Sequence, residues 1–99
     1  MENLWALIKG NLPVFVMFYA SWCPHCRKML PIVRKLENNK HLNLQCFDID
    51  GPASRRLVDY YQVQAVPLMM IYKAGEQLWR WNGEIEEEEL MQTLKRLLK

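Results

Sequence analysis

Apolar and polar positions along this chain follow two alternating patterns. Residues 13–19 are almost continuously apolar and rich in Val and Phe, which is typical of a strand buried on both faces. Residues 24–39 repeat apolar side chains at helical spacing and predict a helix, in which Pro31 should cause a kink because proline has no amide donor. The other predicted elements are helices at residues 2–9, 53–61 and 83–98, and strands at residues 42–49, 68–73 and 77–81.

The order of these elements limits the fold. Helices alternate with the first two strands, which indicates a parallel pair of strands. The Ala74-Gly75 link between the last two strands is too short for a crossover and predicts an antiparallel hairpin. We therefore expect one α/β domain over residues 1–99, with a mixed sheet of about four strands flanked by helices.

Composition and charge exclude several classes of function. The 99 residues are 51% hydrophobic and carry a net charge of +2, which is enough for one core and gives no basic surface for nucleic acid. No apolar run approaches the roughly 20 residues that span a bilayer, so no membrane partner is expected. The N-terminus lacks the basic and apolar regions of a signal peptide, which predicts a cytoplasmic protein. A periplasmic or secreted protein would look the same after its signal peptide was trimmed.

The acidic run at residues 86–89 is the strongest local charge feature. One interpretation is a surface for a partner. The preferred interpretation is a solvated first turn of the last helix, in which these residues and Glu84 complement the helix dipole.

Three cysteines supply the candidate chemistry. Cys23 and Cys26 have C-x-x-C spacing directly after the strand at residues 13–19, and Cys46 is left over. An odd count argues against a framework of structural disulfides and suits a pair that cycles between dithiol and disulfide. Cys23 is the expected nucleophile, because the N-terminus of the following helix favours its thiolate. Cys26, one turn later, is expected to resolve the mixed disulfide.

Several motifs then point to one family. They are Trp-Cys-Pro-His-Cys at residues 22–26, the helical Pro31, Val66-Pro67, the Lys-Ala-Gly-Glu hairpin at residues 73–76, and Gly83. These motifs span nearly the whole chain, which through them resembles the thioredoxin superfamily. The resemblance implies a thioredoxin-like three-layer sandwich, in which a cis bond between Val66 and Pro67 faces the cysteines and the loop lends backbone groups to a substrate peptide. It also implies that the first thioredoxin strand is missing, which leaves residues 42–49 as a sheet edge.

The residues around the two thiols are expected to tune the redox chemistry. Pro24 fixes φ in the first helical turn, and His25 supplies a positive charge or an N–H donor. The Pro-His pair resembles that of the periplasmic oxidant DsbA, whose potential lies near about −120 mV, whereas that of thioredoxin lies near about −270 mV. We therefore expect a potential more oxidising than that of thioredoxin. Trp22 is expected to shield the site, and Val66 and Pro67 to contact substrate.

Two positions depart from the thioredoxin pattern. Typical thioredoxins carry a buried Asp, thought to relay a proton to or from the second cysteine, where this chain has Met17. Many also carry Lys where this chain has Cys46. Replacing the Asp and the Lys together leaves neither charge buried without its partner. Without the Asp, Cys26 is predicted to deprotonate through water or His25. Cys46 is interpreted as a small hydrophobic residue, and the alternative is a third redox thiol.

These observations predict a thiol–disulfide oxidoreductase that acts on protein cysteines and needs neither cofactor nor metal. Its partners would be protein thiols and disulfides and a protein that recycles it. A monomer is expected, with a dimer through the edge strand at residues 42–49 as the alternative. Two other functions stay open: a non-catalytic thioredoxin-fold adaptor, and a metal-binding module formed by Cys23, Cys26, Cys46 and a histidine.

Overall fold

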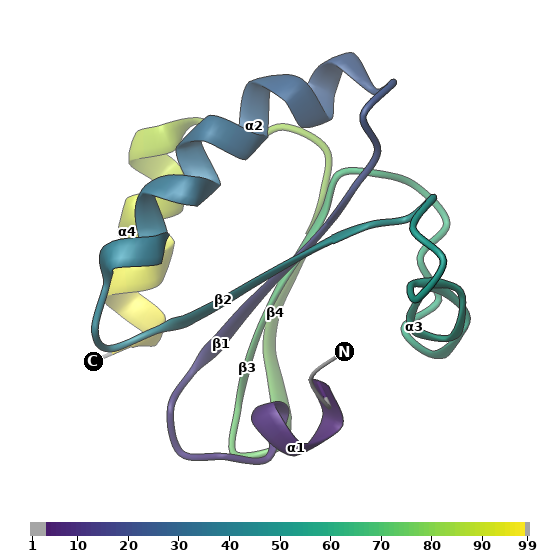
Figure 1. Cartoon of the computed structure of the whole chain (residues 1–99). Helices are drawn as coiled ribbons and strands as arrows, with labels where there is room; N and C mark the ends of the chain where they lie inside the picture. The colour runs from purple at the N-terminus through teal and green to yellow at the C-terminus, as the bar shows by residue number, and fades with distance from the viewer. Residues whose placement is uncertain (1–3, 99) are drawn as a thin grey trace.

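The computed structural model describes residues 4–98. Within this range, α-helices and one 3₁₀ helix are arranged around a sheet of four strands (Figure 1). In chain order the elements are α1 (Leu4–Ile8), β1 (Val14–Tyr19), α2 (Pro24–Arg34), the 3₁₀ helix η1 (Lys35–Asn38), β2 (Asn43–Asp48), α3 (Arg55–Tyr60), β3 (Leu68–Lys73), β4 (Glu76–Asn82) and α4 (Glu87–Leu97).

The sheet is mixed, and its strands lie in the order β2-β1-β3-β4. The predicted parallel pair is confirmed, because β1 runs parallel to β2. The predicted hairpin is also confirmed, because β3 and β4 are antiparallel neighbours. Among the described residues β2 forms one edge of the sheet, as expected for residues 42–49.

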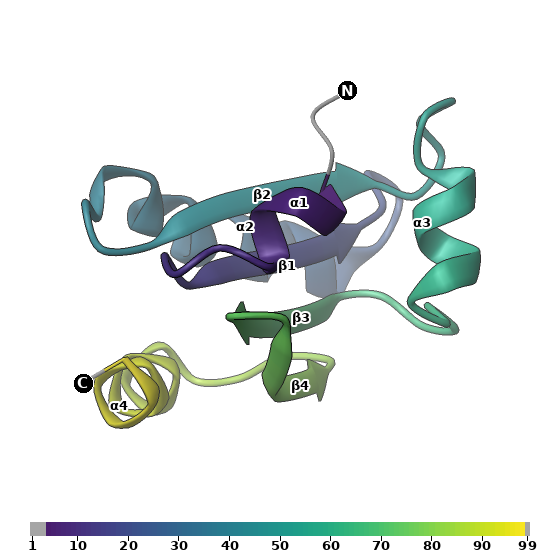
Figure 2. The same ribbon diagram turned by 90° about the horizontal axis from the view of Figure 1, so that it is seen from below.

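Helices cover both faces of this sheet and make three layers (Figures 1 and 2). On one face, α2 and α4 pack on Phe15 and Met17 of β1. On the other face, α1 and the end of α3 pack on Val14, Val16 and Phe18. Because successive β1 side chains enter opposite cores, the strand needs apolar residues at nearly every position. This is the physical reason for the continuous apolar run.

The helix boundaries differ from the sequence prediction in two places. The helix predicted for residues 24–39 continues as α-helix only to Arg34, and its last turn tightens into η1. The helix predicted for residues 83–98 begins at Glu87, because Gly83 has a φ of 95° and Glu86 is extended with a ψ of 141°. Residues 2 and 3 of the first predicted helix lie outside the described residues.

Length and composition also separate these helices from membrane spans. No helix within residues 4–98 combines the length and the apolar character that crossing a bilayer requires.

Candidate active site

Cys23 and Cys26 lie at the N-terminus of α2, where the sequence predicts them. Cys23 is the N-cap residue with an extended backbone, and Pro24 is the first helical residue. The backbone N–H of Cys23 donates to the carbonyl of Ala20 at 3.2 Å, which fixes the turn between β1 and the helix. Both cysteines are free thiols, and their exposed fractions are only 5% for Cys23 and 1% for Cys26.

The surroundings of Cys23 favour its thiolate. Burial opposes ionisation, but hydrogen bonds from the Cys26 thiol and from the backbone N–H groups of Cys26 and His25 outweigh it. The positive charge of Arg27 acts in the same direction, so the pKa of Cys23 lies below its ordinary value. This matches the expectation that a helix N-terminus stabilises the anion.

The surroundings of Cys26 favour its thiol. Burial raises its pKa, and the hydrogen bond to Cys23 together with the negative charge on that sulfur raises it further, to about 11. A small cavity of about 210 Å³ lies beside Cys26 and is lined by Tyr19, Ala20, Ser21, Cys26, Arg27 and Leu30. None of these lining residues is a carboxylate that would accept the thiol proton. The two thiols therefore differ in acidity: the pKa of Cys23 is lowered, whereas that of Cys26 is raised.

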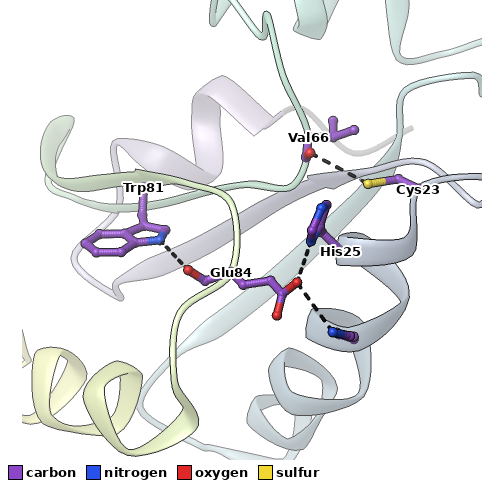
Figure 3. A network of polar contacts seen from close by, with 6 residues as sticks. Cys23, His25, Val66, Trp81 and Glu84 are labelled. Atoms are coloured by element: carbon purple, nitrogen blue, oxygen red, sulfur yellow. Dashed lines mark hydrogen bonds and ion pairs between the residues drawn. The ribbon is translucent and has the colours of Figure 1, made fainter.

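The loop before β3 faces the cysteines, as the resemblance implies. The peptide bond between Val66 and Pro67 is cis. The Cys23 thiol donates to the Val66 carbonyl across 3.7 Å (Figure 3), which is a long, weak sulfur hydrogen bond. The structure thus brings the predicted substrate loop next to the predicted nucleophile.

His25 has a partner that sequence reasoning missed. Its Nδ1 atom forms an ion pair and hydrogen bond with Oε2 of Glu84 (Figure 3). The Nζ atom of Lys28 lies 3.9 Å from the same carboxylate oxygen. The hydrogen bond from His25 and the charge of Lys28 hold the pKa of Glu84 below its usual range. Glu84 therefore does not belong to the first turn of the last helix, which corrects the sequence interpretation.

Trp22 projects outward beside the cysteines. Its indole Nε1 donates to Oδ2 of Asp50 at 2.7 Å, and 62% of the residue stays exposed. The ring is thus held against the turn after β2, and its shielding role stays a prediction.

Met17 and Cys46 are neighbours, as the departure from the thioredoxin pattern implies. Met17 is fully buried in β1, and its register partner on parallel β2 is Cys46. Cys46 is half-buried rather than buried, and burial raises its pKa although Arg34 partly offsets the effect. A thiol held in its neutral form suits the interpretation of Cys46 as a packing residue.

The predicted metal-binding alternative finds no support in the positions of the side chains. Cys46 packs against the core under α2 and α4, whereas Cys23 and Cys26 form a separate cluster with Ala20. Within residues 4–98, no three His, Cys, Asp or Glu side chains come together as a metal site would require.

The Thioredoxin family model matches residues 2–96 of the chain. The chain belongs to the thioredoxin family. The rice (Oryza sativa subsp. japonica) protein Thioredoxin Y, chloroplastic, is 32% identical to it over 92 residues, which cover 93% of this chain and 55% of that protein. Thioredoxin Y1, chloroplastic, of Arabidopsis thaliana is 29% identical over 93 residues and is covered to 54%. The chain thus spans about half the length of these two curated relatives.

Solved structures show the same thioredoxin fold. A mutant thioredoxin from Halobacterium salinarum superposes with a TM-score of 0.82 at 26% identity, covering 97% of this chain and 83% of that one. Oxidized thioredoxin O2 from Arabidopsis thaliana gives a TM-score of 0.77 at 26% identity, with coverage of 90% and 77%. Both the predicted fold class and the predicted family are confirmed.

Proposed function

We propose that this thioredoxin-family chain is a thiol–disulfide oxidoreductase that exchanges disulfides with protein cysteines through Cys23 and Cys26. The observation that carries the proposal is that two buried thiols one helical turn apart have pKa values shifted in opposite directions. The pKa of Cys23 is lowered, whereas burial and the Cys23 sulfur raise that of Cys26 to about 11. Such a pair offers one attacking thiolate and one protonated thiol in reserve.

The reductive half of the exchange follows from this poise. The Cys23 thiolate attacks one sulfur of a substrate disulfide, the substrate S–S bond breaks, and the first substrate thiolate leaves. Cys26 then loses its proton and attacks the Cys23 sulfur of the mixed disulfide. The second substrate thiolate leaves, the Cys23–Cys26 disulfide forms, and two electrons have passed to the substrate. The oxidative direction is the reverse sequence of the same bonds.

We further propose a potential more oxidising than the value of about −270 mV that is typical of thioredoxin. Interactions that stabilise the Cys23 thiolate stabilise the reduced protein, which makes the disulfide the stronger oxidant. Backbone N–H groups and Arg27 supply such interactions, and the Pro-His pair between the cysteines resembles that of DsbA.

The proposed partners are protein thiols and disulfides, together with one protein that recycles the cysteine pair. We propose that the chain acts as a monomer. We propose a cytoplasmic location, with a periplasmic or secreted protein as the alternative. Three cysteines without a disulfide framework suit a reducing compartment. Two of the relatives carry the word chloroplastic in their names, so localisation of a tagged full-length protein decides between these compartments.

Reduction of insulin disulfides with dithiothreitol as the electron source tests the activity. Cys23→Ser should abolish catalysis. Cys26→Ser should accumulate a mixed disulfide through Cys23, visible by mass spectrometry. The matched control is Cys46→Ser, which removes the third thiol and should leave the rate within about twofold. If Cys23→Ser kept the rate of a catalytically active unsubstituted protein, Cys23 would be excluded as the nucleophile. If the unsubstituted protein itself did not catalyse the reduction, and Cys23→Ser kept full biological activity, a non-catalytic adaptor would be the better account.

A further inference from the structure

The backbone of Glu84 is fixed by contacts on both sides of the loop between β4 and α4. The N–H of Gly83 donates to the carbonyl of Pro67 at 2.9 Å. The Trp81 indole Nε1 donates to the carbonyl of Glu84 at 3.1 Å (Figure 3). Between Trp81 and Gly83, the side-chain amide of Asn82 donates to the carbonyl of Ala65 at 3.0 Å. The loop is thereby tied to the segment that carries Val66 and Pro67, and the direction of the Glu84 side chain is set.

The carboxylate of Glu84 forms a hydrogen bond with one of the two ring nitrogens of His25. Figure 3 shows the imidazole lying between Cys23 and Glu84, with Glu84 bound at Nδ1. A carboxylate accepts hydrogen bonds and cannot donate one, so Nδ1 carries the proton of the neutral ring. Nε2 is then the atom that accepts a proton, and the ring cannot turn without breaking the pair.

Among residues 4–98, no carboxylate base lies in the interior beside Cys26. In the mixed disulfide the Cys23 sulfur carries no charge, so burial is the influence that still holds the proton that the Cys26 thiol must lose. Met17, fully buried in β1, cannot accept that proton. No carboxylate lines the cavity beside Cys26. A base on the solvent side of the two sulfurs is therefore the remaining route.

We propose that Glu84 is a positioning residue that holds His25 at Nδ1, so that Nε2 accepts the Cys26 proton through a water molecule. This inference rests on the proposed oxidoreductase function. In the resolving step Cys26 gives its proton to water as the water gives one to Nε2, the Cys23–substrate bond breaks, and the Cys23–Cys26 bond forms. The imidazolium beside the Glu84 carboxylate then passes the proton to solvent or to the leaving thiolate.

The size of the effect follows from the exposure of the pair. General bases typically accelerate a step about 10²- to 10⁴-fold. The side chains of His25 and Glu84 are 65% and 38% exposed, so solvent screens them and the lower part of that scale applies. Glu84→Gln leaves the His25 ring in place and removes only the group that orients it, so we expect resolution to slow less than on loss of the base, about tenfold at neutral pH. The amide removes the charge and also allows the other tautomer, because its NH₂ group can donate to Nδ1.

Ellman's reagent measures the resolving step directly. Mixed with the reduced protein, it gives one equivalent of coloured thiolate when Cys23 attacks and a second when Cys26 resolves the mixed disulfide. The measurement uses a Cys46→Ala background, so that only two thiols react. A first phase without a second in the parent protein would count against the proposed function, whereas the inference concerns only the rate of the second phase.

Three substitutions test whether Glu84 acts by positioning His25 or only stabilises the local structure. Glu84→Gln and His25→Ala should each slow the second phase, and the double substitution should be no slower than His25→Ala alone, since the two residues act as a unit. The control is Glu87→Gln, which removes the same charge from a carboxylate that pairs with Lys35 at 2.8 Å, and it should change nothing. In His25→Ala, which has no ring to act as base, the second-phase rate should rise about tenfold per pH unit through neutrality, as expected for hydroxide, and it should rise less steeply in the parent. An unchanged rate in Glu84→Gln, the same profile in His25→Ala as in the parent, or effects that multiply in the double variant would overturn the proposal.

Discussion

Removal of Cys23 should lower the pKa of Cys26, because the Cys23 sulfur is one reason why that pKa is high. Burial contributes most, and the hydrogen bond and negative charge of Cys23 add to it, giving a value of about 11 against an ordinary value of 9.0. At about 1.36 kcal/mol per unit, this difference favours the protonated form by about 2.7 kcal/mol. In a Cys23→Ala variant only burial still raises the pKa, so Cys26 should titrate at a lower pH than in the parent and remain above its ordinary value.

The assay is a titration of the Cβ carbon shifts in protein labelled with ¹³C at cysteine, followed from pH 6 to pH 12. The matched control is Cys46→Ala, which removes a thiol on β2 and should leave the Cys26 transition in place. An identical Cys26 transition in the parent and in Cys23→Ala would refute the proposed coupling. A Cys26 transition below that of Cys23 in the parent would refute the assignment of Cys23 as the nucleophile.

Three further predictions follow from single residues. Met17→Asp should accelerate insulin reduction near neutral pH, because a carboxylate would then stand on the strand under the site; an unchanged or slower rate in the folded variant contradicts this. Between pH 9 and 11 the unfolded reduced chain loses the Cys26 proton while the folded chain keeps it, so stability should fall as pH rises, by at most about 2.7 kcal/mol. Denaturant unfolding at pH 8 and pH 11 measures this loss, and Cys26→Ala should show a smaller one. Gly83→Ala should cost about 1 kcal/mol, because Gly83 has a φ of 95° that side chains rarely adopt; equal unfolding midpoints would contradict the assignment of strain.

Local patterns were sufficient to predict most of the fold. The apolar run at residues 13–19 predicts a doubly covered strand, and the two cores on either side of β1 explain why. Ala74-Gly75 predicts the hairpin because two residues leave no room for a crossover. The predictions of where the helices begin and end were less accurate. Nothing in residues 35–38 signals a change to a 3₁₀ turn, and Glu84 together with the acidic run at residues 86–89 masks the true start of α4.

The cysteine pair and its loop were predictable, but the partner of His25 was not. Spacing and family resemblance point to Cys23, Cys26, Val66 and Pro67, and the structure brings them together. Glu84 lies 59 positions from His25, and no periodic pattern relates positions that far apart. One available signal was Gly83, since a glycine directly before Glu84 marks a turn that takes the acid out of the helix.

The reduction potential of the Cys23–Cys26 couple decides whether these two thiols form an oxidising dithiol–disulfide pair. The protein would be equilibrated in glutathione buffers of defined ratio, quenched with acid, and the reduced fraction counted by mass after alkylation. A single two-electron transition at a potential less negative than about −270 mV is the predicted result. A transition at that value or below would contradict the oxidising poise, and no transition at all would contradict the dithiol–disulfide function.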